Sequence, residues 1–322
     1  MRDRVFLAAI LVSLLAGCGG ASASEGSGAA VAPASEVDET PALGQPASVR
    51  LLEAGSAPFQ PIRYRFSAGA TATAQLELHM SMGMRLQDQD VPMPNLPPSR
   101  TSLRTNVTAV APNGDAHLTF NIDSIEVIDG DQYDAQIVNA MQQAYETIRD
   151  FSGAMDISPL GVATNVSINI PEGVDDTVRS ILDDMQKSLT QLSMLLPTEP
   201  VGVGARWVAR QTLLVRGIAV EQSINYQLDS RDGDVLVIQS NAAQTAHDAT
   251  MQLPGLPPSA RIVVDALEST GSGQAEVNLT ALVPTADSTV HTNIAARIIA
   301  DGQEQALGLR MELSIHHVPG PI

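Results

Sequence analysis

The segment EGVDDTVRSILDDMQKSLTQLSMLL, residues 172–196, is the stretch around which we expect the rest of the chain to fold. Its large apolar residues recur at spacings of three and four, which places them on one face of an α-helix. They are Val174, Val178, Ile181, Leu182, Met185, Leu189, Leu192 and Leu196. Such a helix is about 37 Å long, enough to cross a sheet. Each of its buried side chains adds about 1.5–3 kcal/mol of stability.

Nearly all of the remaining chain favours β-strands. The clearest is residues 75–86, where apolar and polar residues alternate with the period of two that a half-buried strand requires. Its apolar face consists of Leu76, Leu78, Met80, Met82, Met84 and Leu86. Methionine is flexible and polarisable, so this face can adapt to an irregular apolar ligand. A place in the protein core is the simpler interpretation of the same pattern.

Further strands and one more helix complete the expected fold. The strands are predicted at 101–110, 117–128, 151–170, 207–220, 223–229, 234–241, 262–267, 275–283, 289–299 and 307–318, with turns at 112–114 and 230–233. A second helix is expected over 131–149, with Asp131 as its N-cap. These elements predict an α+β fold that is mainly antiparallel β, with two amphipathic helices packed on the sheet.

The composition argues against several classes of partner and site. The 322-residue chain has a net charge of −18, which repels nucleic acid and anionic lipid headgroups. Aromatic residues make up 3% of the chain, too few for a site that stacks bases or sugars. Cys18 is the only cysteine, so the fold must rely on core packing without disulfides.

The N-terminus has the pattern of an export signal. Residues 1–4 carry two arginines, and residues 5–15 form an apolar run that is too short to span a bilayer. The next four residues, Leu15-Ala16-Gly17-Cys18, resemble the lipobox of bacterial lipoproteins. This resemblance implies cleavage before Cys18, diacylglycerol on its sulfur and an acyl chain on its amine, which together anchor a protein stably to a membrane. An ordinary secretory peptide or a membrane anchor with an incidental cysteine is the alternative.

We therefore expect three regions along the chain. Residues 1–17 are a lipoprotein signal peptide, residues 18–48 a flexible tether rich in Ala, Ser, Gly and Pro, and residues 49–322 a single β-rich domain. The residue after the cysteine is Gly19, and not the aspartate that in lipoproteins is associated with inner-membrane retention. In a host with two membranes, the lipobox resemblance therefore implies the outer membrane.

An internal similarity suggests that the domain consists of two related halves. The segments PNLPPS at 94–99 and PGLPPS at 254–259 agree at five of six positions. They predict duplicated halves at about 60–170 and 201–318, and two similar loops arising by chance are the alternative. Loops stiffened by proline lose little entropy on binding, so the pair would suit the rim of a cleft.

The segment LPTEPVGVGARW, residues 196–207, resembles a motif of uncharacterised bacterial lipoproteins, Pro-x-x-Pro-Val-x-x-Gly-x-x-Trp. Its prolines end the preceding helix, Gly202 and Gly204 allow a tight reversal, and Trp207 is expected to plug the edge of the core. More distantly, the arrangement is similar to the lipoprotein carriers LolA and LolB and the LppX group. That resemblance implies a curved, open half-barrel sheet that wraps helices over an apolar cavity for acyl chains.

Motifs for catalysis or metal binding are missing from the sequence. There is no Gly-x-Ser-x-Gly elbow, no HExxH pair and no glycine-rich phosphate loop. His316 and His317 are adjacent, so in a strand they point to opposite faces and cannot share a metal ion. We expect no enzyme, no metal and no cofactor apart from the lipid on Cys18.

The expected function is that of a non-enzymatic envelope lipoprotein that binds a lipid, an acyl chain or another lipoprotein. The candidate ligand-facing residues lie on the strand at 75–86 and the helix at 172–196. They are Leu76, Leu78, Met80, Met82, Met84, Leu86, Ile181, Met185, Leu189 and Leu192. A structural or assembly protein that binds a protein partner in the envelope is the alternative.

Overall fold

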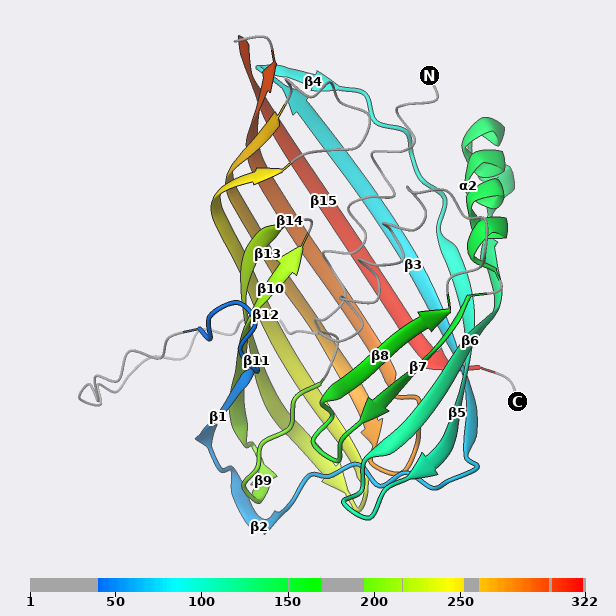
Figure 1. Ribbon diagram of the computed structural model, residues 1–322, viewed down its shortest axis with the longest axis vertical. Coiled ribbons are helices and arrows are strands. Elements are labelled where there is room, and N and C mark those ends of the chain that lie inside the picture. The colour runs from blue at the N-terminus through cyan, green and yellow to red at the C-terminus, as the bar shows by residue number, and fades with distance from the viewer. Residues whose placement is uncertain are drawn as a thin grey trace, which may run out of the picture.

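The computed structural model describes residues 40–149, 151–169, 194–215, 217–251, 261–300 and 303–320. Their main element is an open, 13-stranded antiparallel sheet, with a two-stranded sheet at one end (Figure 1). The prediction of a mainly antiparallel β fold is therefore confirmed.

The order of strands in the large sheet differs from their order in the chain. In space they run β1 (Ser48–Glu53), β10 (Arg206–Val215), β11 (Ile218–Asp232), β12 (Val235–Met251), β13 (Arg261–Asn278), β14 (Thr285–Ala300), β15 (Gln303–Pro319), β3 (Thr71–Leu86), β5 (Ser99–Val110), β6 (Ala116–Val127), β7 (Ser152–Ile157) and β8 (Ala163–Asn169). The short β4 (Gln89–Val91) pairs with β3, and β2 (Ser56–Gln60) pairs with β9 (Val201–Val203). The two predicted halves thus occupy separate sectors, which meet where β15 pairs with β3.

The sheet curves so that its two edges, at β1 and β8, approach each other (Figure 1). Leu160, in the turn between β7 and β8, packs against the core cluster on β10, β11 and β12. Its carbonyl accepts a hydrogen bond from the backbone N–H of Leu196, and Pro159 accepts one from Tyr64. These contacts lie at the end of the strands where β2 and β9 are found, which we call the closed end. The opposite end, where β3 finishes at Leu86, we call the far end.

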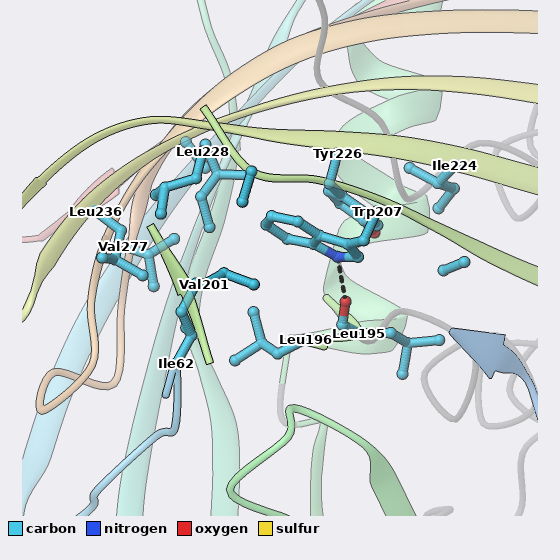
Figure 2. Packing of buried hydrophobic residues seen from close by; sticks show 14 of the residues in the cluster. Ile62, Leu195, Leu196, Val201, Trp207, Ile224, Tyr226, Leu228, Leu236 and Val277 are labelled. Carbon is cyan, nitrogen blue, oxygen red and sulfur yellow. Dashed lines mark hydrogen bonds between the residues drawn. The ribbon is translucent and has the colours of Figure 1, made fainter. Parts of the chain in front are cut away.

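Trp207 is at the centre of the core at the closed end (Figure 2). Its side chain is 0% exposed, and its ring stacks on Tyr226 with 5.3 Å between centroids. Its indole N–H donates a 2.9 Å hydrogen bond to the carbonyl of Leu195. Gly204 has a φ of +85°, so the reversal expected before the tryptophan is present. The prediction that Trp207 is buried in the core is confirmed, although it lies at the centre of this cluster and not at its edge.

The structure describes one of the two predicted helices, and its N-cap differs from the predicted one. Among the described residues there is one α-helix, α2 (Ala135–Ile148), which begins after an N-cap at Asp134 and not at Asp131. The Asp134 carboxylate accepts a 2.7 Å bond from the Gln136 N–H, whereas Asp131 lies in a short 3₁₀ turn at Gly130–Gln132.

Most of the other predicted helix, at 172–196, lies outside the described residues, which resume at 194. Residues 194–196 are irregular and not helical. Pro197 disfavours helical geometry at Leu196, and both Leu195 and Leu196 are buried in the core of the closed end.

Several strands are longer than predicted. The segment 268–274, which contains Gly271 and Gly273, was expected to separate two strands, yet it is the middle of β13. Pairing with β12 on one side and β14 on the other holds this glycine-containing stretch extended. The break predicted within 220–223 is likewise absent, because β11 continues through it from Ile218 to Asp232.

The last residues of the predicted tether lie against the domain. Thr212 on β10 donates a 2.6 Å hydrogen bond to the Pro41 carbonyl, and Ala47 packs on the core. The signal peptide, Cys18 and the tether up to residue 39 lie outside the described residues.

Candidate functional site

An unbroken apolar surface runs along the paired strands β3 and β15. Leu86, Met84 and Met82 lie directly opposite Leu307, Leu309 and Met311. Met80, Leu78 and Leu76 continue the series opposite Leu313, Ile315 and His317. We call these facing pairs the apolar ladder. It forms because both strands alternate in the same phase, so every apolar side chain falls on the same face of the sheet.

The two faces of this part of the sheet differ sharply in polarity. On β3 the residues between the ladder positions are Gln75, Glu77, His79, Ser81, Gly83 and Arg85. Ser81, Gly83 and Arg85 are exposed, whereas Met80, Met82 and Met84 are half-buried. The ladder therefore lies on the inner face of the sheet. Its β3 side is less completely covered than Met311 and Leu313, which are 4% and 2% exposed.

A small pocket opens on the ladder. It is lined by Met82, Met93, Thr292, Ile294, Leu309 and Met311, together with Gly83 and Arg310. The pocket has a volume of about 20 Å³, which is room for roughly one water molecule. An acyl chain needs more space, so its entry requires the methionine side chains to change rotamer, which their unbranched stems allow.

The loop between β4 and β5 lies over this pocket. Met93 comes from that loop, which continues into the PNLPPS segment, where Pro97 and Pro98 are buried. The similar segment at 254–259 lies outside the described residues, so the suggestion that the two loops form the rim of a cleft stays a prediction.

A row of polar side chains crosses the same inner face next to the pocket. Gln211, Gln222, Gln244, Ser269 and Thr292 occupy directly opposed positions on β10 to β14, and the register continues to Met311 and Met82. We call these five residues the polar row. Gln222, Gln244, Ser269 and Thr292 are 4%, 6%, 4% and 2% exposed. Polar groups this deeply buried cost free energy unless they are hydrogen-bonded.

Two side-chain hydrogen bonds link members of the polar row to one another. Gln211 donates a 2.7 Å hydrogen bond to the side-chain oxygen of Gln222, and Thr292 donates one of 2.9 Å to Ser269. The Gln244 amide has no side-chain hydrogen bond within the described parts of the chain. On either side of the row the inner face is apolar, with Ile224 towards the closed end and Leu267 towards the far end.

His317 terminates the ladder at the closed end. Its Nδ1 lies 2.9 Å from the Pro284 carbonyl and donates a hydrogen bond to it in the tautomer protonated there. Burial lowers the pKa of His317 below its ordinary value of 6.5, and the bond to Pro284 offsets this in part. The imidazole is therefore neutral at neutral pH, which keeps charge away from this end of the ladder.

The structure unites six of the ten residues that the sequence singled out. Leu76, Leu78, Met80, Met82, Met84 and Leu86 share one face of β3, as expected. Ile181, Met185, Leu189 and Leu192 lie outside the described residues, as does Cys18. Sequence reasoning missed the β15 half of the ladder and the whole polar row. The sequence did contain one indication of the row. In each of three strands, a glutamine stands at a position where the alternation places the other inward-facing residues.

Two of the other histidines, His117 and His316, form isolated pairs with aspartates on the surface. His316 Nδ1 lies 2.5 Å from Asp287 on the outer face, so His316 and His317 do point to opposite sides of β15. His117 lies 2.6 Å from Asp156, which also accepts a bond from Asn165, and these contacts lower the pKa of Asp156. Across the described ranges, no three His, Cys, Asp or Glu side chains are placed to hold a metal ion.

Comparison with known proteins does not assign the chain to a family. No protein-family model and no curated protein matches the chain. Within the described segments, no helix has both the length and the apolar character needed to cross a membrane.

Proposed function

We propose that this protein is a lipid-anchored bacterial envelope lipoprotein whose curved sheet acts as a half-barrel that binds an acyl chain or a similar apolar ligand. The observation that carries the binding proposal is the apolar ladder, a two-strand surface rich in methionine that is only half-buried on its β3 side. Anchoring rests on the lipobox pattern that ends at Cys18.

The ladder suits a chain-like ligand for two physical reasons. Its pairs are stacked along β3 and β15 at strand spacing, which gives a continuous strip with no charged side chain. Methionines line its centre, and they can repack around a ligand of irregular shape at low cost. The outer-membrane location and the two-helix cover of the half-barrel belong to the same proposal.

The test uses the full chain, purified in mild detergent, and an alkyl-pyrene, a fluorescent hydrocarbon without any carbonyl group. We expect saturable uptake of this probe. Met82→Asn should weaken uptake by at least about tenfold, because it places an unsatisfied amide on the apolar surface.

Ser81→Asn is the matched control, since Ser81 is the neighbouring residue on the exposed outer face of β3. It should leave uptake unchanged. Absence of saturable uptake by the unaltered protein, or equal loss in both variants, would contradict the proposal.

A further inference from the structure

The polar row contains hydrogen-bonding groups for which the described residues supply no partner. Among the described residues, the Gln244 amide has no side-chain partner, and the amide nitrogen of Gln222 has none either. Both side chains are at least nine-tenths buried. An unsatisfied buried amide destabilises the folded state, so a row that merely filled the core would be more stable with leucine at these positions.

The chemistry of the row limits what can satisfy it. Its members are amides and hydroxyls, which both donate and accept hydrogen bonds and carry no charge. A buried phosphate or carboxylate would need a cation beside it, and no member of the row is basic. The complementary group is therefore neutral and polar, and it must be attached to something apolar, because apolar residues border the row on both sides.

The polar row lies beside the apolar ladder on the inner face of the sheet. Thr292 is both the last member of the row and a wall of the pocket. From Gln244 the register crosses β13, β14 and β15 to Met82 on β3. Four steps of about 4.8 Å between strands amount to about 19 Å, the scale of an extended acyl chain.

We propose that the polar row binds the ester or amide carbonyls by which acyl chains are attached to a lipid, while the chains extend across the inner face to the apolar ladder. Gln244 and Gln222 donate to these carbonyls, and the site selects neutral acyl lipids over plain hydrocarbons. This assignment rests on the proposed function and names the ligand class for it. Such carbonyls occur both in free diacylglycerol and in the acylated cysteine of another lipoprotein.

The experiment measures displacement of the alkyl-pyrene from the full chain in detergent by two competitors, dioleoylglycerol and a tripalmitoylated cysteinyl peptide. We expect at least one of them to bind the unaltered protein. Its affinity should fall about tenfold in Gln244→Leu and in Gln222→Leu, the loss expected for one or two hydrogen bonds. Affinity for the alkyl-pyrene should stay unchanged, and the tighter competitor identifies the source of the carbonyls.

Gln274→Leu is the matched control, because Gln274 is an exposed glutamine on the outer face of β13; it should alter no affinity. Melting temperatures verify folding, and Gln244→Leu should melt no lower than the unaltered protein. If Gln244→Leu melts lower because leucine does not fit the site, Gln244→Met is used in its place. Competitor affinities that are the same in the row variants and the unaltered protein would overturn the assignment while leaving apolar binding intact. Failure of the unaltered protein to take up the alkyl-pyrene would overturn both proposals.

Discussion

Trp207 shows how one side chain can join two strands of the sheet to a segment outside it. Its ring stacks on Tyr226 of β11, and its N–H binds the carbonyl of Leu195, which lies outside the sheet. Because the side chain is fully buried, both its volume and its hydrogen bond contribute to stability. The motif around it predicted a plug, and the contacts explain why a tryptophan serves there better than another apolar residue.

Substitutions at Trp207 should separate these two contributions. Trp207→Phe keeps a ring but leaves the Leu195 carbonyl unpaired, so the free energy of unfolding should fall by about 1–3 kcal/mol. Trp207→Ala should cost about 3–5 kcal/mol. Arg206→Ala, which removes an exposed ion pair with Glu53, should cost at most about 1 kcal/mol. Urea denaturation followed by circular dichroism measures all three, and equal losses for Phe and Ala would show that the hydrogen bond dominates.

His317 should make stability depend on pH. Its folded-state pKa is below the ordinary 6.5 because it is buried, so below pH 6.5 the unfolded chain binds more protons than the folded one. Stability should therefore fall as the pH drops below 6.5. The lowered pKa values of Asp156 and Asp265 act in a separate window, below their ordinary value of 3.8.

Denaturation midpoints between pH 7 and 5 measure this effect. His317→Asn should flatten the slope in that range, whereas His316→Asn, on the exposed outer face, should not flatten it. A slope that persists unchanged in His317→Asn would place the titrating group elsewhere.

At the scale of single elements, the backbones of β2 and β9 lie very close together at Gly202. The sequence shows a glycine there but not the strand that approaches it. A Cβ on Gly202 would lie 1.7 Å from the Ser56 carbonyl oxygen, which is backbone and cannot rotate away. Glycine at this position is thus required by packing between β9 and β2. At Gly204 the reason is different, because its φ is +85°.

Gly202→Ala should therefore separate β2 from β9 and lower the free energy of unfolding by at least about 1–3 kcal/mol, the usual range for overpacking. Gly83→Ala is the control, since its nearest neighbour is the Arg310 Cβ at 4.0 Å, and it should be neutral within about 0.5 kcal/mol. Thermal denaturation of both variants checks this. A Gly202→Ala protein as stable as Gly83→Ala would mean that β2 is free to shift.

At the scale of the whole molecule, the apolar ladder exists only because two sectors of the sheet meet at β15 and β3. Residues about 230 positions apart in the chain, such as Met82 and Met311, become direct neighbours there. The proposed anchor is a separate property, which would be carried by Cys18, outside the described residues.

Replacement of Cys18 tests the anchor. Cys18→Ser should abolish labelling by radioactive palmitate and release the protein from sedimented membranes, because no thiol remains to accept the lipid. Ser24→Ala, a change in the predicted tether, should leave both unchanged. Equal labelling and equal sedimentation of Cys18→Ser would refute lipidation at this residue.

The sequence by itself determined the antiparallel β class, the apolar face of β3 and the tryptophan plug, because alternation and local turn chemistry are encoded between near neighbours. The tertiary structure alone decided which strands pair and in what register. That register extended β13 through a glycine-containing segment and brought five polar residues from five strands into one row. A glutamine in an apolar phase looks like an isolated exception in one strand, and it becomes part of a site only when long-range hydrogen bonds align it with its neighbours.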